Sequence, residues 1–200
     1  MGSQKSLAVR LSKLKTFANA NTTLEQYATD SDVAAQVIHN ADMLGDIENK
    51  HVIDLGCGTG ILGLGAVYYG ARKATLLDID EGAVAIAKEN ARALEIDSVG
   101  YILEPVRPVQ GDVVIMNPPF GTKILHADKA FLLAAFKSAP IVHSMHLASA
   151  EDFVKKLAKD EGFTVTHVWP IDFPLKNTMR QHKKRRTYID VIIVRFSKTQ

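Results

Sequence analysis

The sequence has a single cysteine, Cys57, which excludes an internal disulfide and suits a reducing, cytoplasmic compartment. Its Cys and His residues show no metal-ligand spacing, so we expect no metal site. No apolar run reaches the roughly 18 residues of a membrane-spanning helix. The N-terminus also lacks the apolar segment of a secretion signal. We therefore expect a cytoplasmic protein with no part in the membrane.

Net charge is also nearly absent: 24 Lys and Arg residues against 22 Asp and Glu residues leave +2, which says little about partners. There is no internal repeat, low-complexity tract or long linker. An apolar fraction of 46% in 200 residues suffices for one packed core. We expect one domain, residues 1–200, in which the helical segment 1–45 contributes to the functional site.

The spacing of apolar residues predicts a sheet covered by helices on both faces. Two helices are expected first, over residues 5–17 and from the Asp30/Ser31 cap to residue 44. Short β-branched runs then alternate with helical patterns, which indicates a parallel sheet. The expected strands are 51–56, 74–80, 99–104, 112–117 and 140–145, and the expected helices are 61–70, 81–95, 127–139 and 149–162. Runs 164–173 and 187–196 have no helix between them, so they should form an antiparallel hairpin at one edge.

The stretch DLGCGTG, residues 54–60, lies between an expected strand and an expected helix. Gly56, Gly58 and Gly60 allow a tight turn that a ligand can approach closely. A phosphate-binding loop would end in Lys followed by Ser or Thr, and this loop does not. Gly58, Gly60 and Gly63 fit the dinucleotide fingerprint only loosely, so the glycines alone indicate a nucleoside ligand weakly.

Two acidic residues sharpen that interpretation. Asp78 ends the next strand about twenty residues on, where a carboxylate accepts the ribose hydroxyls of a nucleoside cofactor. Asp54 precedes the first glycine; it would repel a pyrophosphate but attract the sulfonium and ammonium of S-adenosylmethionine. We predict that Asp54, Asp78 and the glycine loop bind this cofactor. Asp80 is assigned to capping the helix that starts at Glu81.

A second motif, NPPFGT, begins at Asn117 and follows the apolar run DVVIM. Pro118 and Pro119 stiffen the corner and remove two N–H donors. The Asn117 side-chain oxygen and the Pro118 main-chain oxygen can then accept both N–H bonds of a conjugated amine, which frees its lone pair. Phe120 can stack on the attached ring. Positioning and electrostatics suffice for methyl transfer, so no strong general base is needed.

These motifs, with TLEQYATD at 23–30 and HSMH at 143–146, resemble the archaeal–eukaryotic methyltransferase-like family that makes N6-methyladenosine in small-subunit ribosomal RNA. The similarity runs from about Leu7 to Phe196. It implies a Rossmann-like class I methyltransferase fold, with a mostly parallel seven-stranded sheet and an antiparallel C-terminal hairpin. It also implies that the cofactor pocket is lined by Gln26, Thr29, Gly56, Thr59, Ile61 and Asp78, and that residues 117–120 hold the target adenine beside the cofactor.

The sequence departs from the family in two places. Ala28 stands where the family has the proline of a YPT turn, but Gln26 and Thr29 are both present. Pro105 stands where the family usually has an Asp next to the cofactor's adenine. Adenine recognition would then fall to the Val106 backbone N–H or to Glu104.

The basic stretch 180–186 lies between the two expected hairpin strands, and we expect it on the same rim as NPPF. Cations there would contact a phosphate backbone, with the adenine single-stranded or splayed into the pocket. The proposed RNA-binding residues are Arg180, Lys183, Lys184, Arg185 and Arg186. His143 is expected in packing and His146 as a weak candidate for substrate contact. Family members often need a small zinc-ribbon activator, which is a candidate partner here.

Other functions remain open at this stage. NPPF and NPPY motifs also occur in enzymes that methylate guanine N2 or a glutamine amide of release factors. The basic stretch disfavours a peptide substrate, and LEQYAT disfavours guanine. A cofactor-binding interaction module without catalysis is the third alternative, and the intact NPPF motif argues against it.

Overall fold

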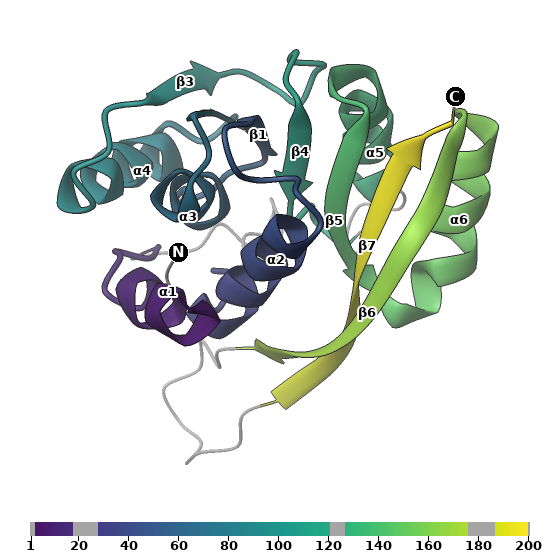
Figure 1. Cartoon of the computed structure of the whole chain (residues 1–200), viewed down its shortest axis with the longest axis horizontal. Helices are drawn as coiled ribbons and strands as arrows, with labels where there is room; N and C mark the ends of the chain where they lie inside the picture. The colour runs from purple at the N-terminus through teal and green to yellow at the C-terminus, as the bar shows by residue number, and fades with distance from the viewer. Residues whose placement is uncertain (1–2, 18–27, 121–126, 176–186, 200) are drawn as a thin grey trace.

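The structure is a computed structural model that describes residues 3–17, 28–120, 127–175 and 187–199. One seven-stranded sheet runs through it in the order β3-β2-β1-β4-β5-β7-β6 (Figure 1). The pairs among β1 to β5 are parallel, and β7 pairs antiparallel with both β5 and β6. The mostly parallel sheet with an antiparallel C-terminal hairpin is confirmed. The strands are β1 His51–Leu55, β2 Lys73–Asp78, β3 Val99–Leu103, β4 Val113–Met116, β5 Ile141–Leu147, β6 Phe163–Leu175 and β7 Thr187–Lys198.

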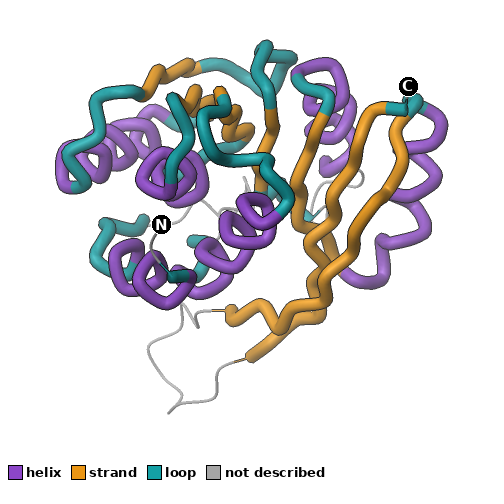
Figure 2. The backbone as a smooth tube through the Cα atoms, viewed as in Figure 1, coloured by secondary structure: helices purple, strands orange, loops and turns teal. Residues whose placement is uncertain are grey.

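Helices cover both faces of the sheet (Figure 2). The α-helices among the described residues are α1 Gln4–Leu11, α2 Ser31–Met43, α3 Ile61–Tyr69, α4 Glu81–Ala93, α5 Ala127–Ser138 and α6 Glu151–Asp160. β4 shows why the strand sequences are continuously apolar. Its side chains alternate between an apolar cluster with α1, α2 and α3 and a second cluster with α5 and α6. All four of its residues are buried, as expected for a parallel strand between two helical layers.

The C-terminal hairpin places β6 at the outer edge of the sheet. β6 contains Pro170 and Pro174, which pair with Ile192 and Tyr188 of β7. Proline cannot donate a backbone hydrogen bond, so it is tolerated in an edge strand but not in a central one. The proline content of this run therefore agrees with its edge position, and the predicted hairpin is confirmed.

The expected helix over residues 5–17 is wrong in its second half, because α1 ends at Leu11. The Ser12 hydroxyl donates to the Val9 carbonyl at the end of the helix, at 2.9 Å. Further on, the Lys15 backbone N–H donates to the Asn90 side chain at 2.8 Å. That N–H would bond to the Leu11 carbonyl in a continued helix, so a tertiary contact replaces a helical one.

The carboxyl ends of β1, β2, β4 and β5 share one edge of the sheet. Asp54 lies near the end of β1, Asp78 ends β2, and Asn117 directly follows β4. The fold thus brings three predicted site residues to the same edge. The connection from β3 to β4, residues 104–112, contains no helix. Within the described residues, none of the helices has the length and apolar character needed to cross a bilayer.

Candidate active site

The glycine loop joins β1 to α3 and adopts the conformation that its sequence predicts. Gly56, Gly58 and Gly60 all have positive φ angles, of 68°, 53° and 83°. A Cβ atom at Gly60 would lie 2.9 Å from Leu76 Cδ2, so this position lacks space as well as a favourable backbone conformation for other residues. The loop therefore requires glycine for backbone geometry and for close packing against β2.

Asp54 is a buried acid whose carboxylate is only partly hydrogen-bonded. It is 1% exposed, and its Oδ2 atom accepts the Gly63 backbone N–H at 2.8 Å. Its Oδ1 atom is buried and has no hydrogen-bond partner among the described residues. Burial raises the pKa of Asp54 to about 7, against the Gly63 hydrogen bond that lowers it, and the charge of Asp78 raises it further. A buried, unpaired acceptor beside a second acid is suited to a cationic ligand.

Asp78 connects the end of β2 to the glycine loop. Its Oδ2 atom accepts the Gly58 N–H at 2.7 Å, and its Oδ1 atom accepts the Asp80 N–H at 3.0 Å. The Asp80 side chain accepts the Ala83 N–H at 3.1 Å and caps α4, as predicted from sequence. The next residue after Asp78, Ile79, is 54% exposed and presents apolar surface at the same strand end. Ile79 was not among the residues singled out from the sequence.

The NPPF corner is fixed to the N-terminal part of the chain. The Asn117 Nδ2 atom donates to the Thr29 hydroxyl at 3.0 Å, across 88 residues of sequence. The Asn117 Oδ1 atom is buried and has no partner among the described residues. Pro118 is buried and Phe120 half-buried, and the Phe120 ring lies edge-to-face with Phe173 of β6, with centroids 6.0 Å apart. The amide therefore presents a fixed, unoccupied acceptor at the end of β4.

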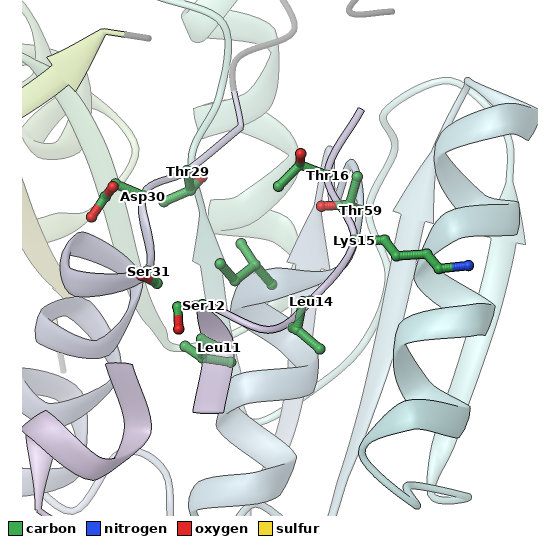
Figure 3. Close-up of a pocket in the computed structure, with 10 residues that line it drawn as sticks. Leu11, Ser12, Leu14, Lys15, Thr16, Thr29, Asp30, Ser31 and Thr59 are labelled. Carbon is green, nitrogen blue, oxygen red and sulfur yellow. The ribbon is translucent and has the colours of Figure 1, made fainter. Parts of the chain in front are cut away.

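A cavity of about 100 Å³ lies between the N-terminal segment and the start of α3 (Figure 3). Three predicted cofactor residues line it: Thr29, Thr59 and Ile61. In Figure 3, Thr29 and Asp30 lie on one side of the view and Lys15, Thr16 and Thr59 on the other. The walls of the cavity are bonded to the strand ends, since Thr29 accepts a hydrogen bond from Asn117 and Gly58 of the glycine loop donates one to Asp78. Its walls are Leu11, Ser12, Leu14, Lys15, Thr16, Thr29, Asp30, Ser31, Thr59 and Ile61.

Asn90 of α4 is a site-neighbouring residue that sequence reasoning missed. It is 1% exposed and hydrogen-bonds to the Lys15 backbone and to the Thr59 carbonyl of the glycine loop. A signal was available, because Asn90 follows Ala83 and Ala87 on the buried, helically spaced face of α4. An amide on an apolar helix face indicates hydrogen-bond partners in the interior.

The connection after β3 begins beside the site. The Glu104 backbone N–H donates to the Asp78 carbonyl at 3.1 Å. The Glu104 side chain pairs with Arg107, and this hydrogen bond lowers the pKa of the Glu104 carboxyl. Val106 is half-buried and packs against the cluster that holds α5 and α6. Of the two candidates for adenine recognition, the Glu104 side chain is partly engaged, because its Oε2 atom is paired with Arg107, and the Val106 backbone N–H is a donor that a carboxylate cannot provide.

Two histidines of β5 are both buried. His143 Nε2 lies 2.8 Å from Asp46 Oδ2, in agreement with the packing role expected from sequence. His146 is 1% exposed, with Nε2 at 2.8 Å from the Ser144 hydroxyl and Nδ1 at 3.8 Å from Asp128 Oδ2. Burial lowers the pKa of His146, against the opposing effect of Asp128. The suggested substrate contact by His146 is therefore wrong, because the ring is enclosed between β5 and α5.

Some predicted residues lie outside the described part of the chain: Gln26, Arg180, Lys183, Lys184, Arg185 and Arg186. In the described ranges, no group of three or more His, Cys, Asp and Glu side chains is arranged to hold a metal ion.

The fold and the site define a Rossmann-like class I methyltransferase, with a glycine loop after β1, an acid after β2 and NPPF after β4. The profile of the family Methyltransferase small domain matches residues 28–142. The rRNA N(6)-adenosine-methyltransferase METTL5 of Danio rerio is 34% identical, over 98% of this chain and 99% of its own length. The chain therefore belongs to the Methyltransferase small domain family and, within it, to the METTL5-like methyltransferases, which confirms the resemblance stated above.

Solved structures agree with this assignment. The crystal structure of PH1948 from Pyrococcus horikoshii matches with a TM-score of 0.91 and 38% identity, over 98% of both chains. Magnesium protoporphyrin IX methyltransferase of Synechocystis, crystallised with S-adenosylmethionine, matches with a TM-score of 0.65 over 96% of this chain and 90% of its own. At 17% identity the latter shows the common fold alone.

Proposed function

We propose that this protein transfers a methyl group from S-adenosylmethionine to the exocyclic N6 amine of an adenine in RNA, in particular small-subunit ribosomal RNA. One observation carries the chemistry: the Asn117 amide is held by Thr29 through its NH₂ group, while its buried oxygen has no partner among the described residues. The near full-length similarity to METTL5 supports adenine in ribosomal RNA as the substrate.

The residues at the ends of β1 and β2 fit the methyl donor. S-adenosylmethionine, when bound, supplies a methyl group on a cationic sulfur and carries an ammonium, ribose hydroxyls and an adenine. Asp54 offers its unpaired Oδ1 atom to the cationic end. Asp78 has further lone pairs for the ribose hydroxyls, because each of its oxygens accepts one backbone N–H. Exposed Ile79 offers apolar surface to the adenine, and the Val106 N–H is assigned as its hydrogen-bond donor.

The remaining donor contacts are assigned to the glycine loop and the N-terminal segment. Gly56, Gly58 and Gly60 allow close approach of the backbone. Thr29, Thr59 and Ile61 line the cavity next to that loop. Gln26 lies outside the described residues and stays a prediction from the family resemblance.

The NPPF corner holds the amine that is methylated. The Asn117 Oδ1 atom and the Pro118 carbonyl accept its two N–H bonds, so that the nitrogen lone pair is no longer delocalised fully into the ring. Pro118 and Pro119 limit backbone movement at these acceptors. The Phe120 ring, steadied edge-to-face by Phe173, supports the base by stacking. The methylated ammonium is acidic enough to release its proton to water.

The C-terminal hairpin is the proposed RNA-binding element. β5 ends at Leu147, which pairs with Val191, but β7 continues from Val191 back to Thr187 and β6 on to Leu175. The hairpin therefore extends past the carboxyl end of β5, on the side of Asn117. Arg180 and the cations 183–186 lie in the connection between those two strands and would contact phosphates near the site.

A protein partner is also part of this proposal. The family resemblance implies a small zinc-ribbon activator that pairs with a sheet edge. Among the described strands, β3 has a neighbour only in β2, and its last residue, Leu103, is 49% exposed. An unpaired edge with exposed apolar surface suits strand addition by such a partner.

The test is transfer of a labelled methyl group onto small-subunit ribosomal RNA from cells that lack this protein, followed by nucleoside analysis. We expect label in N6-methyladenosine, at a rate that the zinc-ribbon partner increases. Label in N2-methylguanosine, or only in protein, would overturn the adenine proposal. Donor binding without any methylated product would instead favour a non-catalytic module.

An Asn117→Ala variant tests the proposed role of Asn117 in amine recognition. We expect donor affinity within about threefold of the wild type and turnover reduced by about 10²-fold or more, as for loss of one preorganised polar contact. If donor binding is lost while the fold is intact, Asn117 has a wider role than amine recognition.

A further inference from the structure

Asn90 forms a buried bridge between three segments that are far apart in sequence. Its Oδ1 atom accepts the Lys15 N–H at 2.8 Å, and its Nδ2 atom donates to the Lys15 carbonyl at 3.0 Å and to the Thr59 carbonyl at 2.9 Å. Both amide N–H bonds are used, each by a different backbone carbonyl. At 1% exposure, Asn90 has no access to water as an alternative partner.

The bridge joins the N-terminal segment 12–17 to the glycine loop. A second contact supports the same junction, since the Phe17 Cζ atom would lie 3.1 Å from a Cβ atom built at Gly58. The cavity described above lies at this junction: Ser12, Lys15 and Thr16 line it from the segment, and Thr59 and Ile61 line it from the loop and α3 (Figure 3). The position of segment 12–17 therefore determines one wall of the cavity.

Leu14 packs the segment against two apolar clusters, and the Asn90 amide is the buried polar anchor described at this junction. The helix ends at Leu11, and the Lys15 backbone groups bond to the Asn90 amide. The Lys15 side chain pairs with Glu89 at 2.7 Å, but these side chains are 69% and 48% exposed. Exposed ion pairs of this kind add little to stability, whereas buried amide contacts to backbone groups are costly to remove.

We propose that Asn90 is a positioning residue for the methyl donor: it holds segment 12–17 against the glycine loop and so keeps the cavity beside Thr59 formed for binding. The proposal rests on the function proposed above. Asn90 acts through Lys15 and Thr59 and touches no reacting atom, so its loss should weaken donor binding rather than the chemical step.

The test compares Asn90→Leu, which has similar volume and no hydrogen-bonding groups, with Glu89→Gln, which removes only the exposed pair from the same helix and segment. Donor affinity is measured by calorimetry with S-adenosylmethionine, and kcat and the donor KM are measured with RNA. For Asn90→Leu we expect at least a tenfold rise in donor Kd and KM, and less than a threefold fall in kcat at saturating donor. Glu89→Gln should stay within twofold of the wild type. Amide hydrogen exchange at Lys15 should be faster in Asn90→Leu alone.

Phe17→Ala is the second variant, because it removes no hydrogen bond and tests the same junction if Asn90→Leu does not fold. We expect it to raise the donor Kd several-fold. Unchanged donor Kd in a folded Asn90→Leu or in Phe17→Ala would overturn the proposal, as would a fall in kcat with unchanged donor KM. If the wild-type protein itself does not bind S-adenosylmethionine, the function proposed above fails. If the wild type binds it and the variants bind it equally well, only the proposed role of Asn90 fails.

Discussion

Thr29 and Asn117 are 88 residues apart in sequence and joined by a hydrogen bond of 3.0 Å from the Asn117 amide to the Thr29 hydroxyl. The bond links the start of α2 to the corner after β4. It also orients the amide, because the NH₂ group is occupied and the oxygen is left for another donor. The N-terminal part of the chain therefore takes part in the geometry of amine recognition as well as in lining the cavity.

Thr29→Val tests this orientation. The change keeps the shape of the side chain and removes the hydroxyl, so the Asn117 amide loses its partner. A hydrogen bond of this type contributes roughly 0.5–1.5 kcal/mol, and we expect kcat/KM for RNA to fall by about tenfold. Thr29→Ser keeps the hydroxyl and should recover most of the lost rate. Equal rates for Thr29→Val and the wild type would show that Asn117 is oriented by other contacts.

Donor binding should depend on pH through Asp54, whose pKa is raised to about 7. A cationic donor prefers the ionised carboxylate, so binding below this pKa must release a proton. We expect the apparent donor Kd to be constant above about pH 7 and to rise about tenfold for each pH unit below it. Calorimetry across this range, in buffers of different ionisation enthalpy, measures both the affinity and the proton released.

Asp54→Asn is the control for this profile. It should bind the donor more weakly at about pH 8 and with little dependence on pH between about 5 and 8. A wild-type profile that persists in Asp54→Asn would assign the titration to another group.

Because the folded pKa lies above the ordinary value of 3.8, Asp54 makes the donor-free protein less stable as pH rises from about 4 to about 7.

Stability should depend strongly on the buried cluster of Asp46, His143 and Arg195. Asp46 lies 2.8 Å from His143 Nε2 and accepts from Arg195 Nε at 2.7 Å and Nη2 at 3.1 Å. Burial alone would raise the pKa of Asp46, but the hydrogen bonds from His143 and Arg195 lower it. Asp46→Asn should lower the free energy of unfolding by about 3 kcal/mol, because it leaves a nearly buried guanidinium without its counter-charge.

Urea unfolding measures this effect, with Glu151→Gln as the control, which removes an exposed pair with Lys155 and should change stability by less than about 0.5 kcal/mol. The lowered pKa means that Asp46 contributes this stability above its ordinary value of 3.8 and loses it at lower pH. Similar unfolding midpoints for Asp46→Asn and Glu151→Gln would contradict the assigned role.

Gly60→Ala and Gly45→Ala separate backbone strain from steric fit. Both residues have similar positive φ angles, 83° and 76°. A Cβ atom at Gly45 meets nothing within 4 Å, whereas one at Gly60 lies 2.9 Å from Leu76. Gly45→Ala should cost about 1–2 kcal/mol from the left-handed backbone alone. Gly60→Ala should cost more by urea unfolding and also weaken donor binding; equal costs would mean that the loop yields easily around the added methyl group.

Much of the fold and the site could be predicted from sequence because the signals are local. Apolar runs and helical spacing identified the strands and most helices. DLGCGTG, Asp78 and NPPF each lie at the carboxyl end of an expected strand, and carboxyl ends of parallel strands meet at one edge. The glycines were informative because a left-handed turn has few alternatives to glycine. The Asp80 cap could also be predicted, because its hydrogen-bond partner, Ala83, is only three residues away in sequence.

Tertiary structure alone decided the contacts between distant residues. Nothing local indicates that Asn90 reaches Lys15 across 75 residues, or that Asp46 meets Arg195 across 149. The end of α1 at Leu11 also depends on a contact between distant residues. The helical sequence pattern continues past Leu11, but the Lys15 N–H bonds to Asn90 and not to a helical carbonyl. The sequence by itself thus determined the strand-end chemistry, which depends on residue type and spacing. The partners that orient Asn117, bury Asp54 and fix segment 12–17 depend on packing between segments, which only the folded chain defines.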